Sequence, residues 1–209
     1  MRRQKLGQTI QAHVKENFSL YLFTLVLFTM GVSFGAIVVG SLEMNQKQDL
    51  MNYLGQFFHE FKQGMDVNPR SAFQQSFIQY LKFIGIMWIL GMSIVGLPII
   101  LIMVFLKGLV VGFTVGFLIQ QWHWNGLLAA GLTVLPQNLV VIPAVIIVGT
   151  AGISFSLRMI RSRFQRIGEP ILHHFIRYSI LVMLMGGILC SAALFVSFIS
   201  PILMKQLNL

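Results

Sequence analysis

The sequence predicts an all-α integral membrane protein with about five transmembrane helices, a cytoplasmic N-terminus and an extracytoplasmic C-terminus. Two observations predict this class. The 209 residues are 56% hydrophobic and only 10% charged, with a mean hydropathy of +0.79, whereas soluble domains have about 25% charged residues. Long uncharged runs also recur along the chain, and about 20 apolar residues suffice to cross the roughly 30 Å of hydrocarbon in a bilayer.

We expect one membrane domain, whose spans are placed by the uncharged runs. Lys107 and Gly108 interrupt a run that is too long for one span, and we interpret these two residues as a turn at the membrane surface. The first run is as long as a full span and lacks an A-x-A-like exit, so we expect a retained anchor rather than a cleaved signal. The expected spans are residues 18–39, 83–104, 108–121 (a short span), 127–151 and 179–200.

Basic residues set the expected orientation, because cytoplasmic loops carry an excess of Lys and Arg. A cytoplasmic N-terminus divides the 15 Lys and Arg residues into ten inside and five outside. Segment 1–17 is expected to lie as an amphipathic helix on the inner leaflet. The basic segment 158–177 is expected to contact anionic lipid headgroups through Arg158, Arg161, Arg163 and Arg166.

The segment 40–82 is the sizeable extracytoplasmic region that this topology predicts between the first two spans. It is expected to form two short amphipathic helices, the second with Asn68 as N-cap and Pro69 at the first helical position. Their apolar faces either pack on each other or on the outer leaflet, or form a docking surface for an extracytoplasmic partner. The aromatic residues of this candidate docking surface are Phe57, Phe58, Phe61, Phe73 and Phe77.

Glycines at four-residue spacing predict close helix packing. This spacing leaves a smooth groove on one helix face, so that another backbone can approach closely. The contact is expected either within the chain or between two copies in a homodimer, and a mobile transport helix is the alternative. The glycines are Gly31 and Gly35 in the first expected span and Gly108, Gly112 and Gly116 in the third.

The stretch "TVLPQNLVVIP" (133–143) predicts a broken or kinked helix in the fourth span. Pro136 and Pro143 each lack a backbone N–H group, which leaves carbonyl groups without their helical partners at membrane depth. Gln137 and Asn138 are expected to hydrogen-bond these carbonyls or a neighbouring helix. A substrate site on a discontinuous helix is the alternative, although no span contains the carboxylate that coupled transporters generally use.

Enzyme chemistry is not expected, and neither is a metal or a cofactor. The chain contains no H-E-x-x-H, G-x-S-x-G, glycine-rich phosphate loop or nucleotide motif. The single cysteine, Cys190, allows no disulfide within the chain. His173 and His174 are adjacent and therefore point to different helix faces, which argues against joint metal binding. His123 lies in the tryptophan-rich sequence "QWHWNG" and is interpreted as an anchor at the outer interface.

Three stretches of the sequence resemble the stage II sporulation protein M family of endospore-forming bacteria: "ENFSLYLFTLVLFTMGVSFGAIVVGSL", "FIGIMWILGMSIVGLPIILIMVFLKGLVVGFTVGFL" and "VLPQNLVVIPA". The wider family often has a P-H-G-x-x-E-x-P-A pattern in the fourth span. Here Gln137, Asn138 and Val141 stand in place of the histidine, glycine and glutamate. The resemblance therefore favours a structural duty over an activity that depends on a buried His and Glu.

The resemblance implies a scaffold for septal peptidoglycan thinning and engulfment during endospore formation. The implied partners are two membrane-anchored peptidoglycan hydrolases, stage II sporulation proteins D and P, together with membrane lipids, and no nucleic acid is expected. The implied location is the cell membrane, at the sporulation septum and the engulfing mother-cell membrane. A small-solute transporter or channel that uses the kinked fourth helix is the alternative function.

Overall fold

A computed structural model of the protein describes residues 17–62, 69–165 and 171–198. Within these ranges the chain forms helices and no strands, which confirms the predicted all-α class. The predicted amphipathic segment 1–17 lies outside the described residues except for Asn17. The elements in chain order are α2 (Phe18–Gly40), α3 (Met44–Lys62), α4 (Pro69–Gly91), α5 (Gly96–Ala129), the π-helix η1 (Ala130–Val134), α6 (Leu135–Gln165) and α7 (Ile171–Phe198).

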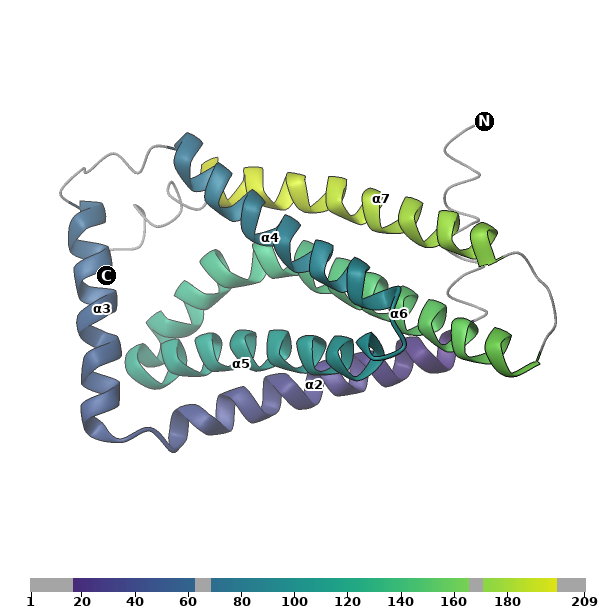
Figure 1. Cartoon of the computed structure of the whole chain (residues 1–209). Helices are drawn as coiled ribbons and strands as arrows, with labels where there is room; N and C mark the ends of the chain where they lie inside the picture. The colour runs from purple at the N-terminus through teal and green to yellow at the C-terminus, as the bar shows by residue number, and fades with distance from the viewer. Residues whose placement is uncertain (1–16, 63–68, 166–170, 199–209) are drawn as a thin grey trace.

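The helices α2, α4, α5, α6 and α7 pack into one bundle, in which α4 runs obliquely, and α3 stands across one end of this bundle (Figure 1). Four of the five are long and apolar enough to cross a membrane. The fifth, α4, is apolar only in its second half, after Lys82. The chain is therefore an all-α membrane protein whose described residues contain four candidate spans: Phe18–Gly40, Gly96–Trp124, Leu135–Ile160 and His174–Leu194.

The expected boundary between the second and third spans is wrong. The chain turns at residues 92–95, where the amides of Met92 and Ser93 donate to the carbonyls of Ile89 and Leu90. The helix α5 then runs past Lys107 without a break. The turn "MSIV" carries no charge, so a hydropathy pattern does not distinguish it from the inside of a span. Lys107 is charged, and from the sequence its charge is therefore interpreted as the sign of a membrane surface. Lys107 consequently belongs to the middle of a span and not to a surface turn.

The expected second helix of the outer loop is the first half of α4, which continues into the bundle. Buried side chains recur along one face of α4 at Tyr80, Ile84 and Met87, the three-to-four-residue spacing of a helix packed on one side. The indole N–H of Trp88 donates to the hydroxyl of Ser179 at 3.2 Å, and the hydroxyl of Tyr178 donates to the carbonyl of Met87 at 3.1 Å. These bonds attach α4 to α7.

The central helix of the bundle is α6. Its candidate span is 67% buried, against 28% or less for each of the other three. Polar side chains of α6 are paired with its neighbours: the Thr150 hydroxyl donates to Thr24 of α2 at 3.2 Å, and the Ser154 hydroxyl donates to Asn17 at 2.7 Å. Buried hydroxyls that find such partners avoid the cost of an unsatisfied polar group in an apolar interior.

The closest helix contact joins α2 to α5 through the predicted glycines. A Cβ atom at Gly31 or Gly35 would overlap a backbone carbonyl oxygen of α5, and one at Gly108 or Gly112 would overlap a carbonyl oxygen of α2. At Gly116, a Cβ atom would lie 3.2 Å from the Cα atom of Ala36. The two glycine faces therefore interlock within one chain, which is the first of the two contacts that the spacing predicts.

Replacing Gly35 with alanine should destabilise the bundle, because the new methyl group would meet the backbone of α5. Overpacking of this kind costs about 1–3 kcal/mol. Gly40→Ala is the matched control, since a Cβ atom there meets nothing within 4 Å and alanine favours the helix by up to about 1 kcal/mol. Thermal unfolding in mild detergent should show a lowered transition for Gly35→Ala alone, and equal stability of both variants would contradict the interlocked contact.

Candidate functional site

The sequence motif at residues 133–143 follows a reversal of the chain at His123. The backbone of His123 is non-helical, with φ 49° and ψ −117°. Beyond it the chain folds back so closely that a Cβ atom at Gly126 would overlap the carbonyl oxygen of Leu118. The side chain of His123 is exposed. The returning segment passes through the π-helix Ala130–Val134 into α6, so the predicted break is a π-helix immediately before Pro136.

The two polar residues of the motif bond to a nearby carbonyl of the same chain segment and to a neighbouring helix. The side-chain amide of Asn138 donates to the carbonyl of Val134 at 2.9 Å, at the end of the π-helix. The side-chain amide of Gln137 donates to the hydroxyl of Tyr80 on α4. We call this second contact the Tyr80–Gln137 bridge. It joins the start of α6 to the middle of α4, and sequence reasoning missed Tyr80 because nothing in the pattern of α4 identifies its partner.

Pro143 lies inside α6, which continues past it to Gln165. Its side chain is exposed, whereas Val141 and Ala144 on either side are buried. The proline ring is therefore on the outer face of the helix. The helix α6 therefore continues through Pro143, and the motif does not end the candidate span.

Two lysines lie on neighbouring helices at similar distances from the turn at 92–95. Lys82 is nine residues before Gly91, the last residue of α4, and Lys107 is eleven residues after Gly96, the first residue of α5. At a rise of about 1.5 Å per residue, these positions are about 14 and 16 Å from the shared turn, close to the middle of a hydrocarbon core of about 30 Å. The Lys107 ammonium lies 6.0 Å from the ring centroid of Phe83, the residue that follows Lys82. The two lysines therefore lie at similar heights along the bundle.

The candidate docking aromatics divide into two groups. Phe73 and Phe77 stack on each other with ring centroids 5.7 Å apart and are partly buried against the core, so they are not part of an exposed surface. The other three, Phe57, Phe58 and Phe61, belong to α3, but their side chains lie outside the described ones. A docking role for α3 stays a prediction.

The described parts of the basic segment, the end of α6 and the start of α7, lie at the bundle end opposite α3 (Figure 1). There the hydroxyl of Ser156 donates to the carbonyl of Ser93 in the turn at 3.0 Å, and an Arg158 guanidinium nitrogen is 3.4 Å from Nδ1 of His174 on α7. Arg158 therefore contributes to a helix contact as well as to the basic surface. The side chains of Arg161 and Arg163, and all of Arg166, lie outside the described part of the chain, so their lipid contacts stay a prediction.

Within the described ranges, no group of three His, Cys, Asp or Glu side chains is arranged to hold a metal ion. Cys190 is a half-buried free cysteine in α7.

The Tyr80–Gln137 bridge should appear as an energetic coupling between α4 and α6. We expect Tyr80→Phe and Gln137→Leu each to lower stability, and the double variant to lose less than the sum, by about 0.6 kcal/mol, as is typical of hydrogen bonds between membrane helices. Tyr80→Phe combined with Thr114→Val is the control, because the Thr114 hydroxyl bonds only within α5, to the carbonyl of Val110. Strictly additive losses for Tyr80 and Gln137 in detergent unfolding would exclude the bridge.

Comparison with known proteins adds one finding. The family model described as Stage II sporulation protein M matches residues 24–201, which include all four candidate spans in whole or in large part. No curated protein and no solved structure matches the chain. The match covers most of the 209 residues, so the chain belongs to the stage II sporulation protein M family, which implies a role in sporulation.

Proposed function

We propose that the protein is a non-enzymatic membrane scaffold for septal peptidoglycan thinning and engulfment, which recruits and anchors stage II sporulation proteins D and P. One observation carries the proposal: the polar groups inside the bundle bond to one another, whereas α3 stands outside it (Figure 1). On α3, the side chains of Met44 and Tyr53 are 83% and 75% exposed. Such a molecule presents surfaces for partners.

The orientation of the bundle supports the same function. The N-terminal end of α2, the turn at 92–95 and the basic end of α6 all lie at one end, joined by the Asn17–Ser154 and Ser93–Ser156 contacts. The positive-inside rule assigns this end to the cytoplasm. The opposite end, with α3, then faces the compartment in which membrane-anchored peptidoglycan hydrolases act.

The transporter alternative has less support. Its candidate site is the kinked motif, but Asn138 is engaged with the carbonyl of Val134 and Gln137 is engaged with Tyr80. The helix that carries them is the most buried of the four candidate spans. A mobile α5 would also have to break its backbone contact with α2 at Gly108 and Gly112.

Replacing Phe57 and Phe61 on α3 with serine should remove the hydrolases from the sporulation septum while leaving membrane insertion intact. The matched control replaces Gln48 and Asn52 with serine, since these residues lie on the other face of α3 and bond to each other at 3.3 Å. Fluorescent fusions of proteins D and P, imaged in sporulating cells, give the readout. Septal hydrolases in the phenylalanine variant, or their loss in the control as well, would contradict a docking role for this face.

A further inference from the structure

The two mid-membrane lysines have no acidic partner in the bundle. The chain contains six acidic residues, and none of them lies in α2, α4, α5, α6 or α7. Charged side chains at this depth generally pair with one another or face a protein interior, because hydrocarbon does not solvate them. The described helices of the bundle therefore supply no opposite charge for Lys82 and Lys107.

Lys82 belongs to a polar groove on the exposed face of α4. The groove has a volume of about 600 Å³ and is lined by Gln74, Gln75, Ile78, Gln79 and Lys82, all of which are exposed. The Tyr80–Gln137 bridge connects Tyr80, which lies between Gln79 and Lys82 in α4, to the first turn of the candidate span of α6. Amide and ammonium groups at membrane depth need hydrogen-bond acceptors that lipid tails do not provide.

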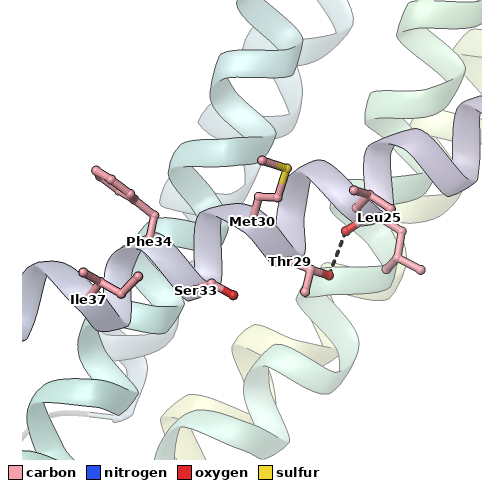
Figure 2. A pocket seen from close by; sticks show the side chains of 7 residues that line it. Leu25, Thr29, Met30, Ser33, Phe34 and Ile37 are labelled. Carbon is pink, nitrogen blue, oxygen red and sulfur yellow. Dashed lines mark hydrogen bonds between the residues drawn. The ribbon is translucent and has the colours of Figure 1, made fainter.

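The groove on the outer face of α2 differs from the α4 groove in the polarity of its lining side chains. This groove on α2 has a volume of about 440 Å³. Its lining side chains are mainly apolar and include Leu25, Met30 and Phe34 (Figure 2). The hydroxyl of Thr29 donates to the carbonyl of Leu25 in the same helix at 2.9 Å, so that polar group is satisfied locally. No charged residue lines this groove, and lipid tails are sufficient to cover it.

The positive charge of Lys82 distinguishes between the possible occupants of the α4 groove. A second copy of the chain would have to supply an acidic group from its own spans, and the spans contain none; a symmetric contact would also bring Lys82 against Lys82, which is repulsive. Lipid phosphates lie at the headgroup level, roughly 15 Å from the middle of a core of about 30 Å. A transmembrane helix with a carboxyl group near its centre supplies both the charge and the hydrogen-bond acceptors at the required depth.

We propose that the groove of Lys82, Gln75 and Gln79 on α4 is a docking site, within the membrane, for a partner's transmembrane helix that carries an Asp or Glu near its middle. Lys82 contacts the carboxyl group, and the two glutamines, on the same face of α4, donate to its remaining polar atoms. Lys107 adds a second positive charge at this level, next to Phe83. The site is separate from the α3 surface and does not depend on which protein provides the helix.

The test uses the full chain with a C-terminal fluorescent protein, reconstituted in phosphatidylcholine vesicles. The probe is a labelled synthetic span of about 20 leucine and alanine residues with one central Glu, and energy transfer reports its association. We expect at least tenfold tighter association than for the same peptide with a central Leu. Lys82→Gln should remove that preference, whereas Ser33→Leu in the α2 groove should retain it. Lys82→Glu should instead prefer a peptide with a central Lys, which excludes simple misfolding as the cause.

Four results would overturn the proposal. Equal association of the Glu and Leu peptides would show that the carboxyl group is not recognised. Loss of the preference for the Glu peptide in the Ser33→Leu variant would show that the peptide binds at the α2 groove and not at α4. Loss of that preference in phosphatidylglycerol vesicles would identify lipid phosphate as the occupant. Energy transfer between two copies of the chain that disappears in Lys82→Gln would identify a second copy.

Discussion

The contact between α2 and α5 is the interaction on which the other helix positions depend. In a bilayer the hydrophobic effect does not drive helices together, and close packing between small residues takes its place. The backbone of α5 packs directly against Gly31 and Gly35, and the backbone of α2 packs directly against Gly108 and Gly112. This fixes the direction of α2, and with it the place where the chain continues from α2 into α3. It also holds α5 in register, so that the turn at 92–95 reaches α6.

Around this pair, α6 organises the remaining helices through polar side chains that bond across helix boundaries. Thr150 and Ser154 bond to α2, and Ser156 bonds to the turn before α5. Gln137 bonds to α4. Each bond satisfies a group that lipid would leave unpaired. The groove on α4 is different, since its amides and its lysine face outward. The described polar groups of α6 thus bond within the chain, and the surfaces at α3 and α4 are the ones that we propose for partners.

Much of this arrangement could be predicted from the sequence because it follows from local rules. Glycine spacing predicted which faces meet, and the amide residues of the motif predicted hydrogen bonds near its prolines, one of which Asn138 makes to the carbonyl of Val134. The turn at 92–95 could not be predicted, because four uncharged residues look like the inside of a span. Lys107 was misplaced for the converse reason, since a sequence pattern does not show that the ring of Phe83 lies beside it. Periodicity also identified the apolar face of Phe73 and Phe77 without showing that the bundle itself covers it.

The most direct test of the scaffold account is affinity purification of the tagged full-length protein from gently solubilised membranes of sporulating cells, with the bound proteins identified by mass spectrometry. The account predicts that stage II sporulation proteins D and P co-purify, and that they are lost when residues 45–80 are scrambled. A preparation that contains neither hydrolase, in a detergent that preserves other membrane complexes from the same cells, would contradict it.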